Sequence, residues 1–183
     1  MKFLPTKFHS AWLIEPDGHE DERGFFARTW CQREFEQRGL NADLVQCSIS
    51  FNRVRGTLRG MHFQAAPHEE AKLVRCTQGS IFDVIVDVRR ESPTCGDWQS
   101  FELSSKNRKS LLIPEGFAHG FQTLEPDSEI LYQMSEFYHP GSARGFHHAD
   151  PQIRVSWPLH VEAISQKDSQ LPPLSLEEQQ AAA

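Results

Sequence analysis

The sequence predicts an all-β protein, an antiparallel sandwich or barrel with a few short helices. Six short runs are rich in β-branched and aromatic residues, which is the composition of strands. Clusters of Gly, Pro, Asn, Asp and Ser separate each run from the next and predict turns. The predicted strands span residues 73–76, 80–88, 98–103, 109–114, 119–124 and 129–137.

The run at 80–88, SIFDVIVDV, departs from simple alternation. Asp83 and Asp87 fall on the same face as Ile81 and Ile85, because side chains alternate along a strand. The opposite face is also apolar. This pattern predicts a strand that is buried over much of both faces.

Helical signals are few. The segment 31–40, CQREFEQRGL, places Phe35 in mid-run and Gly39 at its end, which predicts one short helix. A second helix is expected near 161–168. We expect a single domain over residues 1–174, followed by a polar and then all-alanine tail at 175–183 that is disordered.

Composition limits the class of function. The 183 residues are 38% hydrophobic and 24% charged with a net charge of −6, the composition of a globular protein without a basic footprint for nucleic acid. No apolar run approaches the roughly 20 residues of a membrane helix, and the N-terminus lacks the apolar core of a signal peptide. The four cysteines form no CxxC pair. We therefore expect a cytoplasmic protein that binds neither nucleic acid nor membrane.

The stretch RGTLRGMHFQ, residues 55–64, places Arg59 and His62 in a predicted half-buried strand. Such a strand is either a solvated edge or part of a site that holds an anion and moves a proton. Residues three apart on a regular strand point to opposite faces. If both side chains serve one cavity, a bulge or twist near Gly60 is required, and we expect one there.

Two segments resemble the cupin pattern, which implies a jelly-roll β-barrel. Gly56 precedes His62 by six residues, and residues 114–119 read PEGFAH, a PxGxxH motif. A metal-binding cupin carries a further histidine where this chain has Gln64. A metal triad of His62, Glu69 and His119 remains possible in composition. We predict that the protein uses no metal and no cofactor.

A more specific resemblance covers most of the chain, in order from about residue 3 to residue 174. It is carried by DERGFFARTW (21–30), GTLRGMHFQ (56–64), the segment from EAKLVR to CGDW (70–98), IPEGFAHGFQTL (113–124), ILYQMSEFY (130–138) and ISQKD (164–168). Together these motifs are similar to the dTDP-4-dehydrorhamnose 3,5-epimerase family. The resemblance implies epimerisation at C3, C5 or both of a nucleotide-linked 4-keto-6-deoxyhexose, through an enolate, in deoxysugar biosynthesis.

The resemblance implies four catalytic residues. His62 is the base that removes a proton next to the ketone, and Asp168 orients it. Lys72 stabilises the enolate oxygen, and Tyr132 donates a proton from the opposite face. Each has a structural alternative: a core histidine, a helix cap, a lysine whose amine reaches solvent, and an ordinary strand aromatic.

The resemblance also implies a substrate-binding set, with arginines on the diphosphate. It comprises Arg23, Phe26, Arg28, Gln46, Ser48, Arg59, His119, Tyr138 and Lys167. In the family the Arg23 segment usually reaches the site of a neighbouring subunit. We therefore expect a homodimer. His119 could instead be retained for packing.

Three departures from the family pattern concern the nucleotide. Arg28 and Ala143 stand where the family usually has acids, and Gln46–Cys47–Ser48 replaces a segment that usually reads Gln-Asp-Asn or similar. The sequence therefore leaves dTDP, CDP and GDP open as nucleotides. It also leaves open a 3,4-ketoisomerase, a metal-dependent cupin and a sugar-nucleotide binding protein without turnover.

Overall fold

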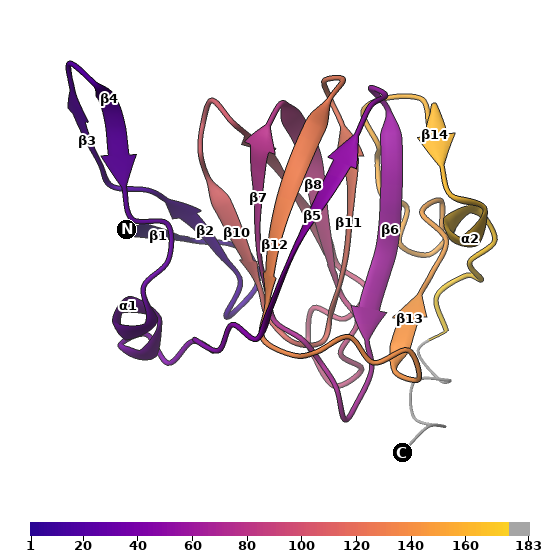
Figure 1. Cartoon of the computed structure of the whole chain (residues 1–183). Coiled ribbons are helices and arrows are strands. Elements are labelled where there is room, and N and C mark those ends of the chain that lie inside the picture. The colour runs from indigo at the N-terminus through magenta and orange to yellow at the C-terminus, as the bar shows by residue number, and fades with distance from the viewer. Residues whose placement is uncertain (176–183) are drawn as a thin grey trace.

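Two β-sheets face one another in the computed structural model, which describes residues 1–175 (Figure 1). Sheet 1 has the order β1 (Lys2–Pro5), β2 (Trp12–Glu15), β10 (Ser110–Ile113), β7 (Lys72–Gln78), β12 (Ser128–Met134) and β5 (Gln46–Asn52). Sheet 2 has the order β13 (Ala143–Gly145), β6 (Thr57–Gln64), β11 (Phe117–Thr123), β8 (Ser80–Asp87) and β9 (Trp98–Ser104). Within both orders the pairing is antiparallel. This is the cupin-type jelly roll that the sequence predicts.

The remaining elements lie at the periphery. A hairpin of β3 (Gly18–Asp21) and β4 (Gly24–Ala27) projects away from the sheets, and β14 (Ala163–Ile164) pairs in parallel with β6 (Figure 1). Helix α1 (Gln32–Glu36) forms where the sequence predicts one, and α2 (Gln166–Ser169) occupies only the end of the second predicted segment. Neither helix of the described residues is long or apolar enough to cross a membrane. The tail beyond residue 175 lies outside the described residues.

All six strands predicted from apolar runs are present, as β7 to β12. Their boundaries differ by a few residues, which is usual for strand ends read from sequence. The strands before residue 53 and the short β13 and β14 were not predicted. In β3, the residues Gly-His-Glu-Asp are all exposed, so no buried face imposes an apolar alternation on them.

The main core lies between the two sheets. Ile81 and Ile85 of β8 point into it, whereas Val84 and Val86 pack in a second cluster on the outer face of sheet 2. Every residue of β8 except Phe82 is buried. The prediction of a strand buried on both faces is therefore confirmed.

Strand β6 contains the irregularity that Arg59 and His62 require. His119 of β11 lies opposite His62, but Phe121 lies opposite Arg59, so three steps on β6 match two on β11. Gly60 has a φ of +127°, and a Cβ there would lie 2.6 Å from the Cα of Gly120, so only glycine fits. The bulge expected near Gly60 is confirmed.

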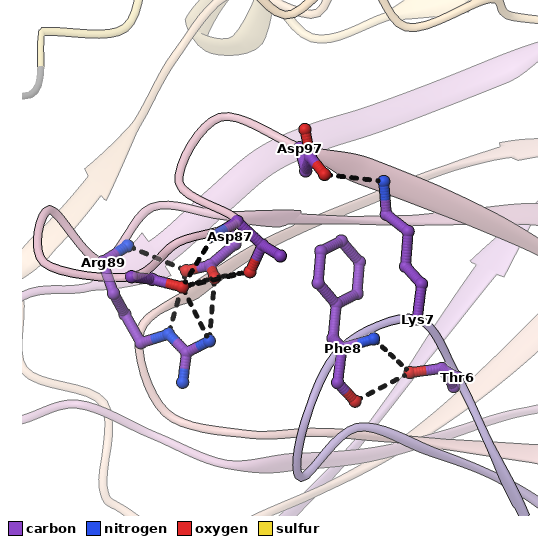
Figure 2. Close-up of polar contacts among 8 residues, drawn as sticks. Thr6, Lys7, Phe8, Asp87, Arg89 and Asp97 are labelled. Carbon is purple, nitrogen blue, oxygen red and sulfur yellow. Dashed lines mark hydrogen bonds and ion pairs between the residues drawn. The ribbon is translucent and has the colours of Figure 1, made fainter.

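The loop between β8 and β9 is organised around a buried carboxylate. Arg89 donates from Nε to Oδ1 of Asp87 at 2.9 Å and from Nη2 to Oδ2 at 2.8 Å, and Thr94 donates to Oδ2 at 2.6 Å (Figure 2). Lys7 pairs with Asp97 of the same loop at 3.3 Å. Lys7 and its neighbour Phe8, which packs in the main core, thereby hold the N-terminal segment against the sandwich.

Candidate active site

A cleft opens between the two sheets. It has two lobes, of about 400 Å³ and about 280 Å³, which share Ser48, His62, Lys72 and Tyr132. The larger lobe is also lined by Gln46, Tyr138 and Lys167, and the smaller by Arg59 and His119. Ten of the thirteen residues proposed from the sequence are therefore gathered here, counting Asp168, which lies directly behind His62.

His62 and Asp168 form a hydrogen-bonded pair, with Nε2 of the imidazole 2.9 Å from Oδ1 of the carboxylate. The Asp168 side chain is 7% exposed and that of His62 is 41% exposed, so the pair runs from the interior to the cleft. A carboxylate can only accept a hydrogen bond. In a neutral ring the proton is therefore on Nε2, which leaves the lone pair on Nδ1.

The local fold at residues 163–169 fixes the position of Asp168. Strand β14 pairs with β6, and Ser165 caps α2 by accepting a hydrogen bond from the Asp168 backbone N–H at 3.0 Å. The second oxygen, Oδ2, accepts from the backbone N–H of Gly60 at 3.2 Å. Burial alone would raise the pKa of Asp168, but the hydrogen bonds from His62, Gly60 and Ser165 and the charge of His62 lower it. The residue that caps the helix is Ser165, so Asp168 does not have the capping role that was its structural alternative.

Tyr132 enters the cleft from sheet 1, facing the sheet that carries His62. Its ring meets that of His119 edge to face, with centroids 6.0 Å apart. Burial raises the pKa of Tyr132, the charge of Asp83 raises it further, and Arg59 opposes this effect. The phenol is therefore neutral and holds its proton at pH 7.

Asp83 is a residue that the sequence did not single out as part of the site. It is fully buried, and its Oδ1 lies 2.7 Å from Nε2 of His119, whose side chain is only 5% exposed. Its other oxygen, Oδ2, is buried without a hydrogen-bond partner among the described residues. An acid on the inner, apolar face of 80–88 was the available signal.

Lys72 is also held by an acid for which the sequence suggested no role. Its Nζ lies 2.8 Å from Oε1 of Glu70, and the two side chains are 11% and 13% exposed. The pair lies in the larger lobe beside His62. The alternative in which the Lys72 amine simply reaches bulk solvent does not fit this burial.

Arg59 is oriented by a buried amide. Asn52 accepts from Nε of Arg59 at 2.7 Å and donates from Nδ2 to the backbone oxygens of Ser50 and Ser128, each at 3.2 Å. Asn52 is 3% exposed, so it is a fixed support. The contact with Asn52 uses Nε of Arg59, and the terminal nitrogens of the guanidinium are donors that suit a phosphate.

Three of the residues proposed for the substrate lie outside the cleft within this chain. Arg23 sits at the tip of the β3–β4 hairpin, where it pairs with Asp21 at 2.6 Å and its side chain is 90% exposed. Phe26 and Arg28 line a separate hollow near the N-terminus. Arg28 pairs there with Glu34 at 3.2 Å.

The alternative metal triad of His62, Glu69 and His119 is not assembled. Both histidines direct Nε2 to their own carboxylates, Asp168 and Asp83. Within residues 1–175, the only group of three His, Cys, Asp or Glu side chains with metal-ligand spacing is a different one, His68, Glu136 and His139.

Comparisons with known proteins agree with this fold. The model of the dTDP-4-dehydrorhamnose 3,5-epimerase family matches residues 5–176. The epimerase of that name from Methanothermobacter thermautotrophicus is 43% identical over 176 residues, which cover 94% of each chain. The crystal structure of the Bacillus anthracis epimerase with TDP and PPi bound superimposes with a TM-score of 0.92 at 39% identity, covering 94% of this chain and 99% of that one.

A relative with a narrower activity has the same fold. ChmJ, a 3'-monoepimerase from Streptomyces bikiniensis in complex with dTDP-quinovose, matches with a TM-score of 0.86 at 30% identity, over 94% of this chain and 87% of that one. The matches extend over nearly the whole of this chain and of its relatives. The chain belongs to the dTDP-4-dehydrorhamnose 3,5-epimerase family and is an isomerase of the epimerase class.

Proposed function

We propose that residues 1–174 form one catalytic domain that epimerises C3, C5 or both of a nucleotide-diphosphate 4-keto-6-deoxyhexose, without a cofactor. The observation that supports this most strongly is the placement of two proton carriers on opposite walls of one cavity. His62, backed by Asp168, comes from sheet 2, and Tyr132 comes from sheet 1. Epimerisation needs such a pair, because a proton leaves one face of the carbon and returns to the other.

The chemistry follows from the acidity of carbons next to a ketone. Nδ1 of His62 takes the proton from C3 or C5, and the bonding electrons move into the carbonyl to give an enolate. Lys72 stabilises the negative oxygen. Tyr132 then donates its hydroxyl proton to the opposite face of the same carbon, and the ketone re-forms. Exchange of one proton with solvent returns the imidazolium and the phenolate to their starting states.

The diphosphate and nucleotide are proposed to bind along the rest of the cleft. Arg59, held by Asn52, suits the phosphates. The larger lobe suits the nucleoside, and it is lined by Gln46, Ser48, Tyr138 and Lys167. Ala143 and Arg144 line this lobe as well. The nucleotide would therefore face Ala143, the position where the family usually has an acid. The names of the relatives favour dTDP as the nucleotide.

A homodimer is proposed to complete each site. The β3–β4 hairpin projects from the sandwich and carries Arg23 and two exposed aromatic residues, Phe25 and Phe26, which are 39% and 79% exposed (Figure 1). An exposed hairpin with large apolar side chains is suited to pack on another copy of the chain. Arg23 would then supply a second guanidinium to the diphosphate of the neighbouring site. We propose a cytoplasmic location for this dimer.

Proton NMR in D₂O with dTDP-4-keto-6-deoxyglucose tests the proposed reaction. Loss of both the C3 and C5 signals with formation of the doubly inverted product identifies a 3,5-epimerase, and loss of one signal with inversion at that carbon identifies a one-centre epimerase. A His62→Ala variant should abolish the exchange, and retention of full exchange would disprove the assignment of the base. If no signal changes with dTDP, CDP or GDP sugars, the proposed reaction is wrong. A ketone that moves to C3 would instead identify a 3,4-ketoisomerase.

A further inference from the structure

A second cluster of ionisable side chains lies beside the cleft but does not line it. Nδ1 of His68 is 3.9 Å from Oε2 of Glu136, and Nε2 of His139 is 3.7 Å from Oε1 of the same carboxylate. One ligand atom from each residue lies within 4.8 Å of the other two. All three side chains are about one third exposed, so an ion from solvent can reach them.

Two loops carry these residues, and a buried side chain joins the loops. Gln64, 3% exposed, donates from Nε2 to the backbone oxygens of His68 at 3.0 Å and of Phe137 at 3.1 Å. Its Oε1 accepts from the backbone N–H of His139 at 2.6 Å. One amide therefore fixes the backbone at two candidate ligands, His68 and His139, and at Phe137, the neighbour of Glu136, which is the preorganisation that a metal site requires.

The donor set is two imidazoles and one carboxylate, which suits Zn²⁺ with a fourth position left for water. Ligand atoms about 2.1 Å from a tetrahedral ion are roughly 3.4 Å apart. One ligand atom from each of the three side chains lies within 4.8 Å of the other two, so side-chain rotations would bring the set around an ion. The two rings are stacked, with centroids 3.5 Å apart and planes 8° apart. A metal lies in the plane of each ring that binds it, so one ring must turn about its side-chain torsions, which are broad for histidine.

We propose that His68, Glu136 and His139 bind a divalent transition-metal ion, with Zn²⁺ as the best-suited ion. The site is separate from the proposed chemistry, because its three side chains do not line the cleft. The loop of His68 also contains Glu70, and the loop of Glu136 and His139 contains Tyr138, and both Glu70 and Tyr138 line the cleft. The bound ion would therefore clamp the rim of the cleft and reduce the mobility of Tyr138.

Titration calorimetry with ZnCl₂ on protein without a histidine tag tests the proposal. We expect one ion per chain and an increase in Tm on addition of Zn²⁺, since an ion that binds only the folded state stabilises it. His68→Gln and His139→Gln should each weaken binding at least tenfold. Co²⁺ bound to the wild-type protein should give the visible absorption of a four-coordinate site, and both variants should lose it.

His160→Gln is the matched control. Nδ1 of His160 lies 3.5 Å from Oε1 of Glu162, but both side chains are largely exposed, at 86% and 61%, and no third ligand joins them within residues 1–175. This variant should bind Zn²⁺ within twofold of the wild type. Failure of about 100 μM Zn²⁺ to bind or to raise Tm would refute the proposal. Zn²⁺ binding by His68→Gln and His139→Gln that is as tight as binding by the wild type would also refute it. If one variant does not fold, the other variant and Glu136→Gln decide the question.

Discussion

Nε2 of His62 and Oδ1 of Asp168 lie 2.9 Å apart, although 106 residues separate them in the sequence. The histidine is on β6, and the aspartate is on a four-residue helix that β14 ties to the same strand. The carboxylate also accepts from the backbone of Gly60, at the bulge that turns Arg59 and His62 into one cleft. One local distortion of β6 therefore serves the base, its partner and the phosphate contact.

Asp168→Asn should lower kcat by about 10²- to 10⁴-fold with little change in KM. An amide in place of the carboxylate can donate to Nε2 of His62, which would move the ring proton to Nδ1 and remove the base. Steady-state kinetics over a range of pH measures this effect. Ser169→Ala, on the exposed neighbour in α2, is the control and should retain wild-type kinetics. A kcat within threefold of wild type in Asp168→Asn would rule out the positioning role.

Tyr132→Phe should separate proton removal from inversion. The variant keeps His62 and the ring, so deuterium should still exchange at the reacting carbon, but proton return to the opposite face should slow by about 10²-fold or more. NMR in D₂O measures exchange and product in one sample. Tyr138→Phe removes the chain's other phenol and should lower kcat less than tenfold. Normal product formation by Tyr132→Phe would mean that another group is the acid.

Mixed dimers of Arg23→Ala and His62→Ala chains should regain activity that neither variant has alone. If Arg23 serves the neighbouring site, each heterodimer contains one complete site, and random pairing gives about a quarter of wild-type activity. If Arg23 serves its own chain, or the protein is a monomer, mixing restores nothing. Equal amounts are mixed after mild dissociation, and initial rates are compared with each variant alone. In the control mixture, Arg53→Ala chains take the place of the Arg23→Ala chains, because Arg53 is another exposed arginine.

Asp87 should make stability depend on acid pH. Burial opposes ionisation, but hydrogen bonds from Arg89, Ser92 and Thr94 lower the pKa of Asp87 to about 2 from an ordinary 3.8. A lowered pKa stabilises the fold above pH 4, and this contribution is lost as pH falls towards 2. Asp87→Asn should therefore cost about 2 kcal/mol in free energy of unfolding at pH 7, and the difference from wild type should shrink towards pH 2.

Urea denaturation at several pH values measures this difference. Asp97→Asn, in the same loop, is the control: its side chain is 57% exposed in a surface pair with Lys7, so we expect a change below about 0.5 kcal/mol. A cost for Asp87→Asn that stays constant between pH 7 and pH 2 would show that packing, not charge, is the cause.

The sequence by itself determined the fold class and the central strands. From β7 to β12, apolar side chains and turn residues recur at strand spacing, because each of these strands contributes side chains to the main core. The sequence also identified which residue types could carry the chemistry. It could not predict β3 and β4, because an exposed hairpin buries no face that constrains its side chains.

Only the tertiary structure decided which side chains meet. The pairs of His62 with Asp168 and of His119 with Asp83 join segments 106 and 36 residues apart, and the register shift at Gly60 is a property of two paired strands. The supporting residues Asn52, Glu70 and Asp83 received no role from the sequence, because their partners Arg59, Lys72 and His119 are identified only by contacts in space. The physical reason is that a hydrogen bond depends on distance in space, whereas strand patterns depend on local periodicity along the chain.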